Sequence, residues 1–339
     1  MITASSRRYL TLSPILASLV ASAAFFAFTL CDNIQQHDTT TVYALAAPMK
    51  VVVSGAGGQT GQSLFRQLLQ RQEEFEPLGL VRSEQSKQSL VETGVDPSKV
   101  AVCDITDSDS VKSVVEEFQS KGGNGDNKIT AFCIATSAKP QPTSEVNEET
   151  GRPVFDFPNG QPEVVDWVGQ KNQIDACPDG CHVVICSTMG GTDPNHPLNN
   201  LGKKMVDDGA DTGNNKEIGG NIVRWKRKAE MYLIEQSPRL QYTIIHPGGL
   251  LNEPGGQRQL VVGIDDDTSW GGTESRTVCR DDVARVMLEA VRYPAKYGGR
   301  SFDLRSKPPE ETDAPTTDFE HLLDPLDGKN CDYKLGAIM

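Results

Sequence analysis

The chain has 339 residues, 37% of them hydrophobic and 23% charged, which is the composition of a globular protein with a sizeable core. Its 33 basic and 46 acidic residues give a formal net charge of -13, which would repel a phosphate backbone and disfavours nucleic-acid binding. A small anionic cofactor is still allowed, because it needs only a local cluster of hydrogen-bond donors. The expected partners are therefore small molecules.

The first 48 residues differ in pattern from the rest of the chain. Arg7 and Arg8 precede an uncharged, largely apolar stretch at residues 9–31, which is the order of a targeting signal. The stretch is long enough to cross a bilayer, but its serines, threonines and small residues favour a cleaved signal. A polar segment at residues 33–41 and small residues before Pro48 follow, in an order that resembles the bipartite presequence of plastid proteins in algae with complex plastids. We therefore expect plastid import. The alternatives are secretion and an uncleaved anchor, which would be the chain's only contact with a membrane.

Beyond this segment, short β-branched runs alternate with helical patterns. Residues 50–54 predict a first strand, and Leu64, Leu68 and Leu69 then share one helical face. Further apolar runs predict strands at residues 78–81, 100–103, 129–134, 182–186, 242–245 and 302–304. Helical spacing intervenes at Val165, Val168 and Ile174; at Trp225, Ala229, Tyr232 and Leu233; and at Val283, Val286, Met287, Ala290 and Val291. This alternation predicts an α/β fold with a doubly wound parallel sheet, because parallel neighbours need crossover connections.

The pattern divides the chain into a presequence at residues 1–48, a domain at residues 49–323 and a tail at residues 324–339 that carries no clear signal. Within the domain, residues 203–220 are acidic and rich in glycine, which predicts a mobile surface loop that is either a lid or an insertion. Residues 308–315 predict another loop.

Most of the eight cysteines lie in or beside strand-like apolar runs, which predicts reduced core thiols. They are Cys31, Cys103, Cys133, Cys177, Cys181, Cys186, Cys279 and Cys331. Three residues separate Cys177 from Cys181, and no second matching pair accompanies them, so we expect no metal site there. A turn with incidental thiols is favoured, and a regulatory disulfide is the alternative.

The clearest functional motif lies between the first strand and the first helix. Residues 55–61 read GAGGQTG, and Gly55, Gly58 and Gly61 fit the three roles of a dinucleotide-binding turn: leaving the strand, approaching the pyrophosphate and packing helix on sheet. A glycine triplet alone is weak, but its place between strand and helix strengthens it. The predicted site also includes Gly57, Gln59 and Thr60.

The ends of the next strands complete the predicted cofactor site. A conventional NAD site has an acid after the second strand, whereas Arg82 and Ser83 stand there. A cation at this position favours a 2′-phosphate, so NADP is predicted, with NAD as the alternative cofactor. The simpler interpretation of Arg82 is an exposed arginine at the end of a strand. Asp104 and Ile105 are candidates for the adenine contact, although Asp104 equally suits a helix cap. The predicted site also includes Ala135 and Thr136, after the fourth strand.

Several strings together resemble the atypical short-chain dehydrogenases, in particular the NAD(P)-binding Rossmann proteins of plant chloroplasts. They are GAGGQTG, VRS at 81–83, CDIT at 103–106, DWVGQKNQIDA from Asp166, STMGGTDPNHPLNNLG from Ser187, WKRKAE at 225–230, YTIIHPGGL from Tyr242 and FDLRSKP from Phe302. The resemblance covers residues 50–323. It implies a Rossmann domain with NADP in its cleft, a small C-terminal substrate lobe and a plastid location.

One departure from that family concerns the cofactor. Such proteins commonly carry an arginine within the glycine turn that also grips the 2′-phosphate, and Gln59 stands at that position. The predicted preference for NADP then rests mainly on Arg82.

A second departure concerns catalysis. Short-chain dehydrogenases place a tyrosine four residues before a lysine, whose charge lowers the phenol pKa so that the tyrosine exchanges a proton with substrate. Aligning WKRKAE puts that lysine at Lys226 and leaves Ile222 in the tyrosine position. Taking Lys228 instead puts Arg224 there. Lys226 remains a candidate for binding the nicotinamide ribose, but neither alignment supplies the acid.

Other polar residues near strand ends are candidates for the missing chemistry. Ser187 and Thr188 follow the fifth strand and can orient a substrate oxygen. His246, at the end of the sixth, titrates in a range that suits proton transfer, although a structural histidine is the favoured interpretation. Asn172 is expected to hold a water or a backbone group, or to be a polar residue that bends its helix. The nicotinamide pocket is predicted to include Pro247, Gly248 and Gly249.

Three functions fit these residues. The first is an NADP-dependent oxidoreductase acting on a small carbonyl, quinone or isoprenoid-like compound. The second is a non-catalytic NADP(H)-sensing or assembly protein, which the missing tyrosine would explain. The third is an epimerase or isomerase, and the fold alone does not separate the three.

Overall fold

The computed structural model describes residues 47–121, 128–148, 151–207, 215–267 and 276–336, and residues 47–339 form one compact unit. The predicted targeting segment, apart from its last two residues, lies outside the described residues, as does Cys31. In the part of the chain that is described, no helix is both long and apolar enough to cross a bilayer.

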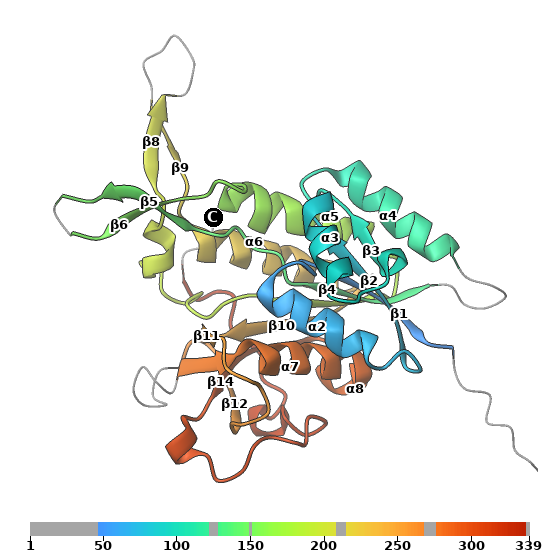
Figure 1. Ribbon diagram of the computed structural model, residues 1–339. Coiled ribbons are helices and arrows are strands. Elements are labelled where there is room, and N and C mark those ends of the chain that lie inside the picture. The colour runs from blue at the N-terminus through green and yellow to red at the C-terminus, as the bar shows by residue number, and fades with distance from the viewer. Residues whose placement is uncertain (1–46, 122–127, 149–150, 208–214, 268–275, 337–339) are drawn as a thin grey trace, which may run out of the picture. The chain divides into compact units, whose positions relative to one another are not determined.

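A mostly parallel sheet lies at the centre of this unit (Figure 1). Its parallel strands run in the order β3-β2-β1-β4-β7-β10-β14. They are β1 (Met49–Ser54), β2 (Phe75–Val81), β3 (Val100–Val102), β4 (Ile129–Ile134), β7 (His182–Cys186), β10 (Gln241–Pro247) and β14 (Arg300–Ser306). The strand order reverses between β1 and β4, which is where open α/β sheets bind ligands at the carboxyl ends of their strands.

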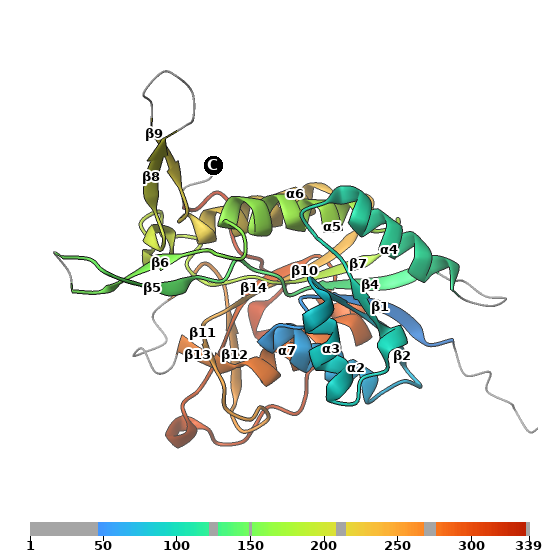
Figure 2. The same cartoon turned by 45° about the horizontal axis from the view of Figure 1, so that its top comes forward.

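Helices cover both faces of the sheet (Figure 2). On one side lie α2 (Gln59–Leu69), α3 (Glu84–Glu92) and α7 (Arg280–Arg292), and on the other α4 (Ser108–Ser120), α5 (Gln170–Ala176) and α6 (Ile222–Glu235). Val51 and Val53 of β1 pack with the apolar face of α2, whereas Val52 packs in the second core with α4 and α5. Alternate residues of one strand thus fill two cores, and the predicted doubly wound Rossmann fold is confirmed.

Two helical patterns differ from the prediction. Val168 is exposed, because residues Glu163–Gly169 form a π-helical turn before α5, and its wider spacing turns Val168 away from buried Val165. In α6 the sheet-facing side buries Lys226 and Glu230 beside Leu233, whereas Trp225 and Tyr232 are only half-buried. Apolar periodicity misplaced this face because it assumes that charged side chains stay in water.

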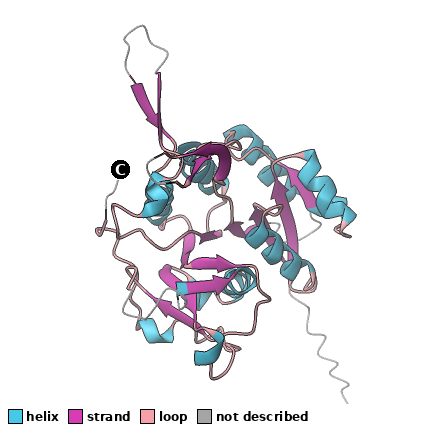
Figure 3. Cartoon of the chain, turned by 60° about the vertical axis from the view of Figure 1, so that its left-hand side comes forward, coloured by secondary structure: helices cyan, strands magenta, loops and turns pink. Residues whose placement is uncertain are grey.

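Hairpins account for regions that the pattern left as loops. The two ends of the segment 203–220, expected as a mobile loop, pair antiparallel as β8 (Lys204–Asp207) and β9 (Asn215–Ile218), while residues 208–214 lie outside the described residues. This hairpin stands out from the neighbouring helices (Figure 3). A second hairpin joins β5 (Gln141–Val146) to β6 (Pro153–Asp156).

The C-terminal third adds strands to one side of the sheet. β12 (Leu260–Gly263) pairs antiparallel with β14, and β11 (Gly249–Leu251) pairs with β13 (Thr277–Cys279). The short helix α8 (Pro294–Tyr297) precedes β14. The expected small substrate lobe remains a prediction.

The predicted state of the cysteines is confirmed for the described part of the chain. All seven cysteines there are free, and all but Cys186 are buried. Cys177 and Cys181 flank a turn in which Gly180 has φ +77°.

Candidate functional site

The glycine turn has the geometry that a dinucleotide requires. Gly55 leaves β1 with φ +74°, and a Cβ there would lie 2.6 Å from the carbonyl oxygen of Ala135. A Cβ on Gly61 would lie 2.3 Å from the Gly55 oxygen, so only glycine lets α2 approach the turn this closely. Gly58 begins α2 without a side-chain cap. The amides of the first turn of α2 therefore remain available to an anion, as at other phosphate-binding helix ends.

Arg82 lies next to this turn, directly after β2. Its Nη1 and Nη2 donate to the carbonyl and side-chain oxygens of Asn159, at 2.9 Å and 2.8 Å, so the guanidinium is held in place although it is exposed. Ser83 caps α3 and accepts from the Ser86 amide at 3.2 Å. Ser86 lies beside Gly57 of the turn. A fixed cation and two hydroxyls therefore occupy the place where an NAD site would have an acid.

The next predicted residues line the same edge of the sheet. Asp104 accepts from the backbone and hydroxyl of Thr106, at 2.9 Å and 2.7 Å, whereas Asp107 caps α4. The alternative of Asp104 as the helix cap is therefore wrong. Asn172 donates to the Ile105 carbonyl at 3.0 Å, as expected of a side chain that holds a backbone group. Ala135 and Thr136 follow β4, where the Ala135 amide donates to Ser54 at 3.2 Å.

Gln59 connects the turn to a second region. Its Nε2 donates to Asn252 Oδ1 at 3.3 Å, and the same oxygen accepts from Arg280 Nη1 at 2.5 Å. Arg280 begins α7 and lines a cavity of about 760 Å³. This cation beside the turn carried no recognisable sequence signal, because it lies more than two hundred residues away along the chain.

The cavity of about 760 Å³ lies where β7 and β10 end. Its lining includes four of the predicted residues, which are Thr188, Pro247, Gly248 and Gly249. The pattern missed the others, which are Met189, Gly190, Thr192, Asp193, His196, Leu198, Leu250, Asp266, Arg276 and Arg280. A Cβ on Gly248 would lie 2.0 Å from the Arg276 oxygen, so the chain closes tightly behind the cavity. Ser187, Lys226 and His246 do not line it. The volume fits a small substrate beside a cofactor fragment.

Lys226 is held away from solvent by an acid. Its Nζ lies 2.8 Å from Asp166 Oδ1, and the two side chains are 6% and 0% exposed. The other oxygen of Asp166 accepts from the Ala138 amide at 3.1 Å. Ile222, one turn earlier, is buried and carries no proton donor. The conventional tyrosine–lysine pair is therefore absent from this helix, as the sequence indicates.

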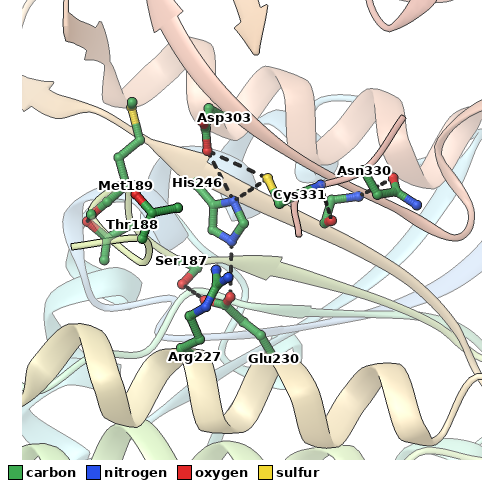
Figure 4. Close-up of polar contacts among 12 residues, drawn as sticks. Ser187, Thr188, Met189, Arg227, Glu230, His246, Asp303, Asn330 and Cys331 are labelled. Carbon is green, nitrogen blue, oxygen red and sulfur yellow. Dashed lines mark hydrogen bonds and ion pairs between the residues drawn. The ribbon is translucent and has the colours of Figure 1, made fainter. Parts of the chain in front are cut away.

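Ser187 and His246 meet on Glu230 rather than in the large cavity (Figure 4). Ser187 Oγ donates to Glu230 Oε1, and His246 Nε2 lies 3.0 Å from Oε2. Burial alone would lower the pKa of His246, but the charge of Glu230 outweighs it and holds that pKa well above its usual value. Burial alone would raise the pKa of Glu230, but the charge of His246 and its hydrogen bond outweigh burial, so that pKa is lowered. The pair therefore favours imidazolium and carboxylate.

The C-terminal tail completes this polar cluster. Cys331 Sγ lies 3.5 Å from His246 Nδ1, and Arg227 donates to the Asp332 carbonyl at 2.7 Å. The guanidinium of Arg227 also stacks 4.4 Å from the ring centre of Tyr333. A tail without a clear sequence signal thus closes over β10 and α6.

Apart from Lys226, which lies on α6 and pairs with Asp166, the predicted cofactor residues gather along the carboxyl ends of the parallel strands. Thr188 and residues 247–249 join them at the large cavity, whereas Ser187 and His246 belong to the buried cluster. The roles assigned to these residues remain predictions.

Comparison with known proteins agrees with this geometry. The NAD(P)H-binding family profile matches residues 55–294. The chain is 41% identical over 290 residues to an uncharacterized chloroplastic protein of Arabidopsis thaliana, covering 84% of this chain and 78% of that protein. It is 38% identical over 296 residues to sanguinarine reductase of Eschscholzia californica, covering 81% of this chain and 95% of that protein. A second uncharacterized chloroplastic protein of Arabidopsis thaliana is 30% identical over 249 residues, covering 71% of each chain. The resemblance to Rossmann proteins of plant chloroplasts is thereby confirmed, and the chain belongs to the NAD(P)H-binding family of Rossmann-fold proteins.

Proposed function

We propose that the protein is an NADPH-dependent oxidoreductase that reduces a small carbonyl, quinone or isoprenoid-like compound. The observation that carries this proposal is the cavity of about 760 Å³ at the ends of β7 and β10, on the same edge of the sheet as the glycine turn. A dinucleotide that lies across the switch point from the turn brings its nicotinamide toward that cavity. The 38% identity to a relative named a reductase, over 95% of that relative, supports reduction.

The preference for NADP rests on Arg82. Its guanidinium, positioned by Asn159, and the hydroxyl of Ser83 provide donors for a 2′-phosphate, and the position directly after β2 holds this cation instead of an acid. We expect Arg82→Ala to raise the Kd for NADPH about 10-fold to 100-fold, the worth of one charge-assisted contact, and to leave the Kd for NADH nearly unchanged. Arg66→Ala, on the same side of the sheet but bonded to Thr93, is the matched control. An equal loss for both cofactors would refute the role of Arg82.

Protonation of the reduced product needs a donor other than the usual tyrosine. The hydride passes from NADPH to the electrophilic carbon, and the developing oxyanion takes a proton from solvent or from a group at the cavity. Thr188 and His196 line the cavity and carry exchangeable protons, whereas His246 has both ring nitrogens engaged inside the protein. We propose Thr188 and His196 as the groups nearest to the reacting oxygen.

The test follows NADPH absorbance against a panel of carbonyls and quinones. We expect turnover with at least one member, a lower kcat for Thr188→Val and His196→Asn, and unchanged NADPH binding by both variants. Leu201→Ala, outside the lining of this cavity, is the control. Turnover that neither substitution alters would remove Thr188 and His196 from the reaction.

A non-catalytic NADP(H)-sensing protein is the second candidate. Ile222 in the tyrosine position and the pairing of Lys226 with Asp166 favour it, because both remove parts of the conventional catalytic machinery. Tight NADPH binding without consumption across the whole panel would support this candidate and exclude the reductase.

We also propose a plastid location, from the composition of residues 1–48 and from the two relatives that are chloroplastic proteins. A fluorescent protein fused after residue 48 should enter plastids of an alga with complex plastids. Delivery to the medium or retention in another membrane would refute plastid import.

A further inference from the structure

An imidazole nitrogen, a carboxylate oxygen and a thiol sulfur from distant parts of the chain converge at the end of β10. His246 Nδ1 lies 3.3 Å from Asp303 Oδ1 and 3.5 Å from Cys331 Sγ, and the sulfur lies 3.8 Å from the same carboxylate oxygen. All three residues are buried. Figure 4 shows His246 between Glu230 on one side and Asp303 and Cys331 on the other.

These separations match those of ligands around one tetrahedral zinc ion. Bonds of about 2.3 Å to sulfur and about 2.1 Å to nitrogen or oxygen place tetrahedral ligands about 3.4 Å (N to O) and about 3.6 Å (S to N or O) apart. A direct hydrogen bond between imidazolium and carboxylate would be shorter, at about 2.7 to 2.9 Å. The separation between His246 and Asp303 is therefore wider than direct pairing requires, and the three separations together have the size that a central ion needs.

We propose that His246, Asp303 and Cys331 bind one zinc ion, with a water molecule as the fourth ligand. Imidazole, carboxylate and thiolate are ligands that zinc accepts together, and three protein ligands with an open fourth position are typical of its reactive sites. Sequence spacing does not reveal the site, because its residues come from β10, β14 and the tail.

Hydrogen bonds already orient each ligand. Glu230 Oε2 lies 3.0 Å from His246 Nε2, which keeps the ring proton on Nε2 and directs the Nδ1 lone pair toward the ion. The second oxygen of Asp303 accepts from the Asp266 amide at 2.8 Å. The Cys331 amide donates to Ser301 at 3.2 Å. Such outer contacts fix ligand direction before the ion arrives.

The charges around this position also favour a cation. Glu230, Asp303, Asp265 and Asp266 line the same small cavity, whereas Arg227 is the cationic side chain in that lining besides His246.

A cavity of about 10 Å³ lies against all three ligands. That volume holds about one water molecule. Thr188, Thr192 and Asp266 line both this cavity and the one of about 760 Å³, so the two adjoin. The zinc-bound water would lie at the border of the proposed substrate cavity, and the ion would join the tail to the sheet. The metal site does not depend on the proposed reductase activity.

The test uses the full chain, stripped of metal with a chelator and titrated with Zn²⁺ or Co²⁺. We expect one zinc per chain after gel filtration, measured by mass spectrometry of the metal, and a near-ultraviolet thiolate-to-metal band with Co²⁺. Cys331→Ser should lose that band, and Cys331→Ser and His246→Gln should each weaken zinc binding about 100-fold or more. Cys279→Ser, which removes another buried free thiol outside the cluster, should bind as the unsubstituted chain does.

The unsubstituted chain decides the proposal even if a variant fails to fold. No zinc above background at excess metal, or a Co²⁺ spectrum without the thiolate band, would overturn the site. Retention of one zinc and of the thiolate band by Cys331→Ser would also overturn it.

Discussion

A methyl group at Gly61 tests the glycine turn directly. The Cβ of Gly61→Ala would lie 2.3 Å from the Gly55 oxygen and 2.7 Å from its carbonyl carbon, whereas real Cβ atoms keep at least 3.0 Å. Both obstructing atoms are backbone, so no side chain can swing away. The helix α2 must retreat from the turn by at least 0.7 Å, the difference between 3.0 and 2.3 Å. Overpacking of this kind costs about 1 to 3 kcal/mol.

Gly57→Ala is the matched control within the same turn. A Cβ there would lie 3.4 Å from the Ser86 Cβ, an ordinary contact, and Gly57 does not have a positive φ. In urea denaturation without cofactor, we expect Gly61→Ala to lose about 1 to 3 kcal/mol and Gly57→Ala to stay within about 0.5 kcal/mol of the parent. The displaced helix should also raise the Kd for NADPH about 10-fold to 100-fold. Equal stability of the two variants would refute the argument that α2 needs a glycine to pack.

Three further perturbations test parts of the fold that support the site. Burial lowers the pKa of His182 to about 4, so as the pH falls the unfolded chain binds a proton at this histidine before the folded protein does. We therefore expect the free energy of unfolding to fall by about 2 kcal/mol between pH 7 and pH 5 because of this group, and His182→Gln should remove that loss. An identical pH dependence in that variant would contradict the burial argument. Asp166→Asn should lower the free energy of unfolding in urea by about 3 to 5 kcal/mol, because it leaves Lys226 buried without its partner. Asp175→Asn, in an exposed ion pair, should lower it by less than about 1 kcal/mol. Similar losses in the two variants would refute the distinction between buried and exposed pairs. Lys50→Met removes two hydrogen bonds from Lys50 Nζ to carbonyl oxygens at the end of α4, and it should lower the free energy of unfolding by about 1 to 3 kcal/mol in the same assay. A loss near zero would mean that water replaces the two hydrogen bonds.

The chain's local patterns predicted most of the sheet. The β-branched run before Gly55 and the glycines after it indicated strand, turn and helix, because backbone sterics and burial on both faces act within a few residues. The same reasoning misplaced the buried face of α6, where Lys226 and Glu230 face inward. Their partners, Asp166 and His246, lie on other elements, and hydrophobic periodicity has no means to represent them.

By itself, the sequence determined the class of fold, the cofactor turn and the absence of the usual tyrosine. Each of these depends on residues that are neighbours along the chain. Only the tertiary structure brought Arg280 beside Gln59, and Cys331 beside His246 and Asp303. The physical reason is that burial makes a polar group seek a partner wherever the fold supplies one, and crossover connections bring together strand ends that are far apart in sequence.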